Sequence, residues 1–93
     1  MAGVAGQFGV HEVAIGADVT RVTGRCYTGP LRTGDVFRGA QASSGEHAAV
    51  ALTIVAIECY GHLMDEIQEG LTARLTLRGT GAEDLAAETV LST

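Results

Sequence analysis

The sequence predicts a single all-β domain of the sandwich or barrel type, and three observations lead to this prediction. Thirteen glycines are spread over the 93 residues and separate short apolar segments. These segments are rich in β-branched residues or alternate apolar with polar side chains, which is typical of strands. No stretch keeps a 3.6-residue apolar period over the length of a helix.

The strands can be placed in order along the chain. In "LTARLTLR", Leu71, Ala73, Leu75 and Leu77 share one face, and the threonines and arginines share the other. The segment that starts at residue 19 places arginines alternately with Val22, Gly24 and Cys26 in the same way. The predicted strands cover residues 8–15, 19–28, 49–60, 71–78 and 89–91, and a turn after residue 28 leads into Val36-Phe37.

The segments between the strands contain turn residues. Gly29-Pro30 ends the second strand, Leu31 is expected to pack inward, and Gly34-Asp35 forms a tight turn. Residues 38–48 are polar and glycine-flanked, which predicts an exposed loop. Residues 81–88 are compatible with one helical turn before the last strand.

Composition excludes several classes of protein. The chain has six arginines, no lysine and eleven acidic residues, which give a net charge of −5. A P-loop requires a lysine on the phosphates, so a conventional P-loop nucleotidase is excluded. The acid excess disfavours general binding to nucleic acid, which needs a cationic face.

The sequence also suggests where the protein works. No apolar run approaches the ~20 residues that cross a bilayer, and no basic residue precedes an apolar run at the N-terminus. Cys26 and Cys59 are interpreted as small buried residues in a reducing compartment, with a disulfide as a minor alternative. We therefore expect a cytoplasmic protein of one domain, residues 1–93, with a short lead at residues 1–7.

The stretch "IECYGHLMDE" resembles half of a metal site, because Cys59 and His62 have a C-x-x-H spacing. Zinc needs four ligands, so His11 or His47 would have to come from other strands. We therefore predict no metal and no other cofactor.

A nucleophilic site is equally incomplete. Ser43 and Ser44 precede His47, but the chain has no G-x-S-x-G elbow and no third partner that would orient the histidine. The sequence predicts no catalytic residue and no enzyme activity, and a small metal-dependent enzyme stays a minor alternative.

Five segments, in order, resemble the second domain of translation elongation factor Tu and related translation GTPases. The resemblance covers residues 8–91. The matching residues are Thr23-Gly24-Arg25, Gly29 with Leu31 and Gly34-Asp35, Ile57 to Tyr60 with Leu63 and Asp65-Glu66, Gly70 with Leu77-Arg78-Gly79, and Glu83-Asp84-Leu85 with Val90-Leu91.

The resemblance implies a small, closed antiparallel β-barrel of about six strands. In that family the domain contacts the GTPase domain and helps to hold the aminoacylated 3′ end of transfer RNA, and Glu58 matches the glutamate at that end. Four positions depart from the pattern. They are Gly61 for a basic residue, Leu71 for aspartate, Thr72 for asparagine and Glu88 for glycine, so the last turn either changes its backbone or puts glutamate where glycine is favoured.

Two further groups of side chains are candidates for binding. Arg21, Arg25, Arg74 and Arg78 are expected to point outward, either as a solvated face with ion pairs to Glu12, Asp18 or Glu58, or as a patch that docks an anion or a partner. Of the aromatic residues, Phe37 is predicted in the core, whereas Tyr60 could be core or interface.

The leading hypothesis is a non-catalytic binding module that acts through protein–protein contact, with an unknown protein partner or by self-association. The alternative is a protein that binds RNA ends of the transfer RNA acceptor type. The candidate binding residues are Glu58, Tyr60, Arg25, Arg74 and Arg78.

Overall fold

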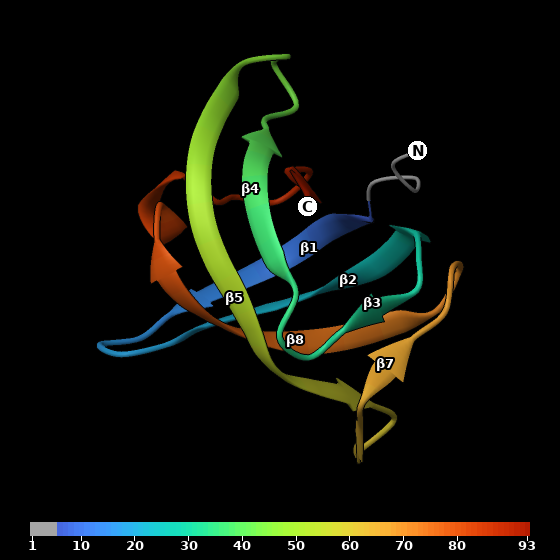
Figure 1. The fold of residues 1–93 in the computed structure, drawn as a ribbon. Helices are drawn as coiled ribbons and strands as arrows, with labels where there is room; N and C mark the ends of the chain where they lie inside the picture. The colour runs from blue at the N-terminus through green and yellow to red at the C-terminus, as the bar shows by residue number, and fades with distance from the viewer. Residues whose placement is uncertain (1–5) are drawn as a thin grey trace.

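The protein is a β-barrel in which the sheet closes on itself (Figure 1). A computed structural model describes residues 6–93. Within them the ring runs β4, β9, β1, β2, β8, β5 and back to β4, and every pair is antiparallel. This confirms the predicted closed barrel of about six strands. The ring strands are β1 (Gln7–Ile15), β2 (Thr20–Thr28), β4 (Val36–Gln41), β5 (His47–Cys59), β8 (Thr72–Thr80) and β9 (Val90–Ser92).

Three short strands lie outside the ring. β6 (His62–Met64) forms a hairpin with the end of β5. β3 (Leu31–Arg32) pairs with β7 (Glu66–Ile67) in a separate two-stranded sheet, which lies beside one end of the barrel in Figure 1. The sequence predicted none of these strands, because each has only two or three residues and no alternation to recognise.

The core fills the barrel interior and comes from the inward positions of the ring strands. The largest fully buried side chains include Phe8, Phe37, Leu52, Leu75 and Leu77. Arg21 and Arg25 on β2 and Arg74 and Arg78 on β8 are exposed, as the alternation predicts.

The prediction that Leu71 lies on the inner face of the strand is wrong. Its side chain is 39% exposed, unlike those of Ala73, Leu75 and Leu77. Leu71 precedes β8 in a turn, where its N–H donates to the Gln68 carbonyl and its carbonyl accepts from the Cys26 N–H. Because these bonds fix its backbone in the turn, its side chain does not follow the alternation of the strand.

The predicted loop at residues 38–48 is also wrong over most of its length. β4 continues to Gln41 and β5 begins at His47, so only residues 42–46 connect them. This part of β4 is paired with a strand on each side. Ala40 lies opposite Ala48 of β5 and Leu91 of β9, and it is buried. The segment is polar because its other side chains point outward.

The segment before the last strand contains the predicted helical turn, a 3₁₀ helix η1 (Ala82–Asp84). Glu88 then takes a positive φ of 72°, and its N–H donates to the Val10 carbonyl at 2.8 Å. Of the two outcomes expected at this position, the structure shows glutamate in a backbone conformation that favours glycine.

The N-terminal lead predicted at residues 1–7 falls outside the described residues except for its last two. Gln7 begins β1, and the N–H of Gly6 donates to Thr93 Oγ1 at 2.9 Å. These two residues therefore belong to the barrel. In residues 6–93, no helix has the length and apolar character needed to span a membrane.

Candidate functional site

The ion pair between Glu58 and Arg74 forms one side of the candidate site. The two residues lie directly opposite each other on β5 and β8. Arg74 Nε donates to Glu58 Oε1 at 2.9 Å, and Arg74 Nη2 contacts the same oxygen. The side chains are 51% and 32% exposed, so water screens the pair and its contribution to stability is below about 1 kcal/mol.

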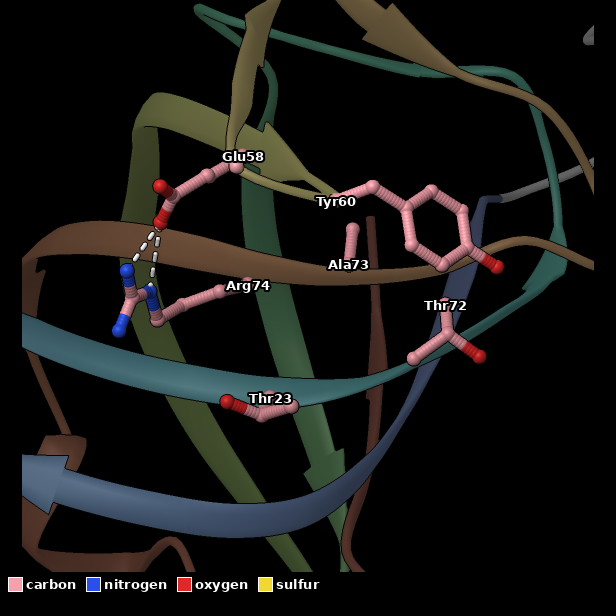
Figure 2. Close-up of a pocket in the computed structure, with 7 residues that line it drawn as sticks. Thr23, Glu58, Tyr60, Thr72, Ala73 and Arg74 are labelled. Carbon is pink, nitrogen blue, oxygen red and sulfur yellow. Dashed lines mark hydrogen bonds and ion pairs between the residues drawn. The ribbon is translucent and has the colours of Figure 1, made fainter.

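A shallow hollow of about 370 Å³ lies beside this ion pair on the outer face of the barrel. Figure 2 shows Glu58 and Arg74 at one side of the hollow and the Tyr60 ring and Thr72 at the other. The hollow is lined by Thr23, Glu58, Tyr60, Gly61, Thr72, Ala73 and Arg74.

The β5–β6 hairpin places Tyr60 over this surface. Cys59 pairs with His62, so Tyr60 and Gly61 form a two-residue loop. Their φ angles of 52° and 79° match a type I′ turn. Asparagine or glycine is usual at the first loop position, whereas a bulky side chain with positive φ is an outlier.

The hairpin is also the most exposed apolar part of the described chain. Tyr60 is 84% exposed, Leu63 is 80% exposed and Met64 is 43% exposed. We call these three residues the hairpin surface. Three large apolar side chains exposed within residues 60–64 are typical of an interaction site.

Replacing Tyr60 by asparagine should therefore stabilise the protein. Tyr60→Asn relieves the left-handed strain by about 1 kcal/mol, and it removes no buried contact because the ring is exposed. Urea denaturation measures the change. Gly61→Ala is the control and should destabilise, since Gly61 also has positive φ. If Tyr60→Asn were destabilising, the strain argument would be wrong.

The predicted arginines are only partly brought together. Arg74 is in the site, and Arg25 lies opposite Thr72 with its Nε donating to the Gly70 carbonyl at 3.2 Å. Arg78 lies opposite Thr53, further along β8 and away from the hollow. In residues 6–93 the expected ion pairing of this face is found for Arg74 but not for Arg21, Arg25 or Arg78.

The cysteines and the C-x-x-H spacing do not form a common site in the described part of the chain. Cys26 and Cys59 are free and buried, and Cys59 Sγ donates to the Thr72 carbonyl at 3.3 Å. Burial raises the pKa of the Cys26 thiol, with a smaller effect from the charge of Glu69. No three histidine, cysteine, aspartate or glutamate side chains of residues 6–93 come together as metal ligands.

Leu63, Met64, Thr23 and Thr72 are site residues that the candidate list from the sequence lacks. Thr23 and Thr72 depend on the register between β2 and β8, which the sequence does not reveal. Part of a signal for the hairpin was present, because Gly61 suits the second loop position of a type I′ turn, but Tyr60 does not match the residues usual at the first position.

Comparison with solved structures identifies the architecture. Two structures of translation elongation factor SelB from Methanococcus maripaludis, the apo form and the complex with the GTP analogue GppNHp, each match with a TM-score of 0.75. Sequence identity is 15%, and the match covers 97% of this chain and 19% of the SelB chain. The chain has a translation-factor β-barrel fold.

The chain spans about a fifth of the length of the SelB chains, and at this identity the match establishes the fold alone. No family model and no curated protein sequence matches. A fold of this kind does not by itself define a function.

Proposed function

We propose that the protein is a non-catalytic, protein-binding module of the translation-factor barrel type, and that it contacts its partner through the hairpin surface. The observation that carries this proposal is Tyr60, which is 84% exposed and has a positive φ. A bulky aromatic residue in this position is unfavourable in the isolated chain. Exposed aromatic residues of this kind are anchors in protein interfaces, where burial recovers apolar area.

Electrostatics at the site favour a protein partner over a phosphate backbone. The carboxylate of Glu58 is already paired with Arg74, so the surface next to Tyr60 is close to neutral. The whole chain carries a net charge of −5, which repels nucleic acid at long range. A partner with an apolar patch of its own fits this surface best.

The non-catalytic part of the proposal rests on the chain's own chemistry. The chain has no lysine for a P-loop, and the hollow is shallow and open on the outer face of the barrel. We place the protein in the cytoplasm, where two free cysteines remain reduced.

One arrangement favours RNA-end binding as a second candidate. Glu58 and Tyr60 line the same hollow, where the ring could stack on a base and the carboxylate could accept a bond from a ribose hydroxyl. In this case Arg74 would have to release part of its contact with Glu58.

Photo-crosslinking in cells separates the two candidates. A benzophenone amino acid replaces Tyr60 in one variant and Ile15 in a matched control, since Ile15 is 59% exposed and lies at the end of β1. We expect Tyr60-site crosslinks to protein that are lost when Leu63→Ser is added, and none from the Ile15 site.

The outcomes are distinct for each hypothesis. Crosslinks from the Tyr60 site that disappear on ribonuclease treatment would support RNA-end binding and contradict the proposal. No crosslink from the Tyr60 site, or equal crosslinks from both sites, would also overturn it.

A further inference from the structure

β6 lies outside the closed ring and is paired along only one of its two edges. Its inner edge pairs with β5, with Cys59 opposite His62, Glu58 opposite Leu63, and Ile57 opposite Met64. In an antiparallel hairpin with a two-residue loop, the first pair exchanges hydrogen bonds and the second does not. The N–H and carbonyl of Leu63 therefore point away from β5.

The free edge is limited to this one residue. The next position, Asp65, has its carbonyl engaged by the N–H of Thr33 at 3.1 Å. Leu63 has no backbone hydrogen bond outside the strand ladders in residues 6–93, and its side chain is 80% exposed. One outward donor and one outward acceptor on the same residue can accommodate a further strand.

We propose that this edge binds the same edge of a second copy, with the two β6 strands antiparallel about a two-fold axis at Leu63. In this register each Leu63 N–H donates to the Leu63 carbonyl of the other copy. A single outward-facing residue suits such a symmetric contact, because both of its backbone groups are satisfied at once. The inference rests on the proposed function and names the partner.

The side chains of the hairpin surface are compatible with this symmetry. The two Leu63 side chains meet at the axis, and His62 of each copy lies beside Met64 of the other. Glu58 is on the same face as Leu63 but is paired with Arg74. The two-fold contact thus brings apolar side chains together without an unpaired charge at its centre.

A second folded copy fits better than a free extended peptide. A flexible peptide would lose conformational entropy on binding, which one residue's pair of backbone bonds could hardly offset. In a second copy, β6 is already ordered by its pairing with β5. Each copy also brings its own hairpin surface, so that the apolar contact is self-complementary.

Sedimentation equilibrium tests the proposal by comparing the wild type with the Leu63→Pro variant. Both purified chains are measured from about 10 µM to about 1 mM. Proline removes the outward N–H but no bond to β5, so the variant should keep the melting temperature and circular dichroism of the wild type. We expect a wild-type monomer–dimer equilibrium and at least about a tenfold higher dissociation constant for Leu63→Pro. Val55→Ser, at a position 40% exposed and outside the hairpin surface, should leave the equilibrium unchanged.

Two results would overturn the proposal. The first is a wild type that stays monomeric throughout, and the second is a folded Leu63→Pro variant that dimerises as tightly as the wild type. If the wild type is monomeric while the Tyr60 site still crosslinks to another protein, the second copy is excluded and the proposed function stands. If the wild type is monomeric and the Tyr60 site crosslinks to no protein, both fail.

Discussion

Gly24→Ala is expected to destabilise the barrel by about 3 kcal/mol or more. A Cβ at this position would lie 1.9 Å from the Gly9 carbonyl oxygen, 2.9 Å from its carbon and 3.0 Å from the Phe8 ring. The closest of these atoms belong to the backbone of β1, so no rotamer change can relieve the overlap. A domain of this size has a free energy of unfolding of only about 5–14 kcal/mol, so urea denaturation should show a large shift of the midpoint.

Gly39→Ala is the matched control. Gly39 is also in a ring strand, its φ is not positive, and nothing lies within 4 Å of a Cβ built there. The substitution should change stability by less than about 1 kcal/mol, with stabilisation expected from the lower entropy of the unfolded chain. If the two substitutions changed the free energy of unfolding equally, the close approach of β1 and β2 at Gly24 would not be the cause of the loss.

The alternation of side chains predicted most of the ring because it directly reflects which face of a strand is buried. β8 is the best case, since its apolar residues from Ala73 to Leu77 are buried as predicted. Residues 38–48 are the opposite case. Their outward side chains are polar and Ala40 is small, so the inner face of β4 left little apolar signal, and the pairing with β9 depends on a contact across the chain.

For the candidate site, the sequence predicted which types of residue could interact but not which of them are neighbours in space. The sequence indicated that Glu58 could pair with an outward arginine, but four arginines alternate on two strands. The register of β5 with β8 selects Arg74, and register depends on the whole barrel. The exposure of Tyr60 was equally hidden, because an aromatic residue next to an apolar strand fits a core as well as a surface.

Phe37→Ala should be the second large effect, with a loss of about 3–5 kcal/mol. The Phe37 side chain is fully buried and its residue lies opposite Leu52 of β5. β4 also pairs with β9, so a cavity at Phe37 weakens a strand that connects β5 to β9 in the ring. Urea denaturation measures the loss, and hydrogen exchange of β9 amides should become faster.

Phe37→Leu separates the cavity from the loss of an aromatic ring. Leucine fills much of the same space, so this variant should lose less than about 2 kcal/mol and keep the protection of β9. Comparable losses in the alanine and leucine variants would contradict the cavity argument. Tyr60→Ser should cause no such loss, because the Tyr60 side chain is exposed and held at a positive φ. The two aromatic residues then differ in their contribution to stability: the buried Phe37 side chain stabilises the fold, whereas the exposed Tyr60 side chain does not.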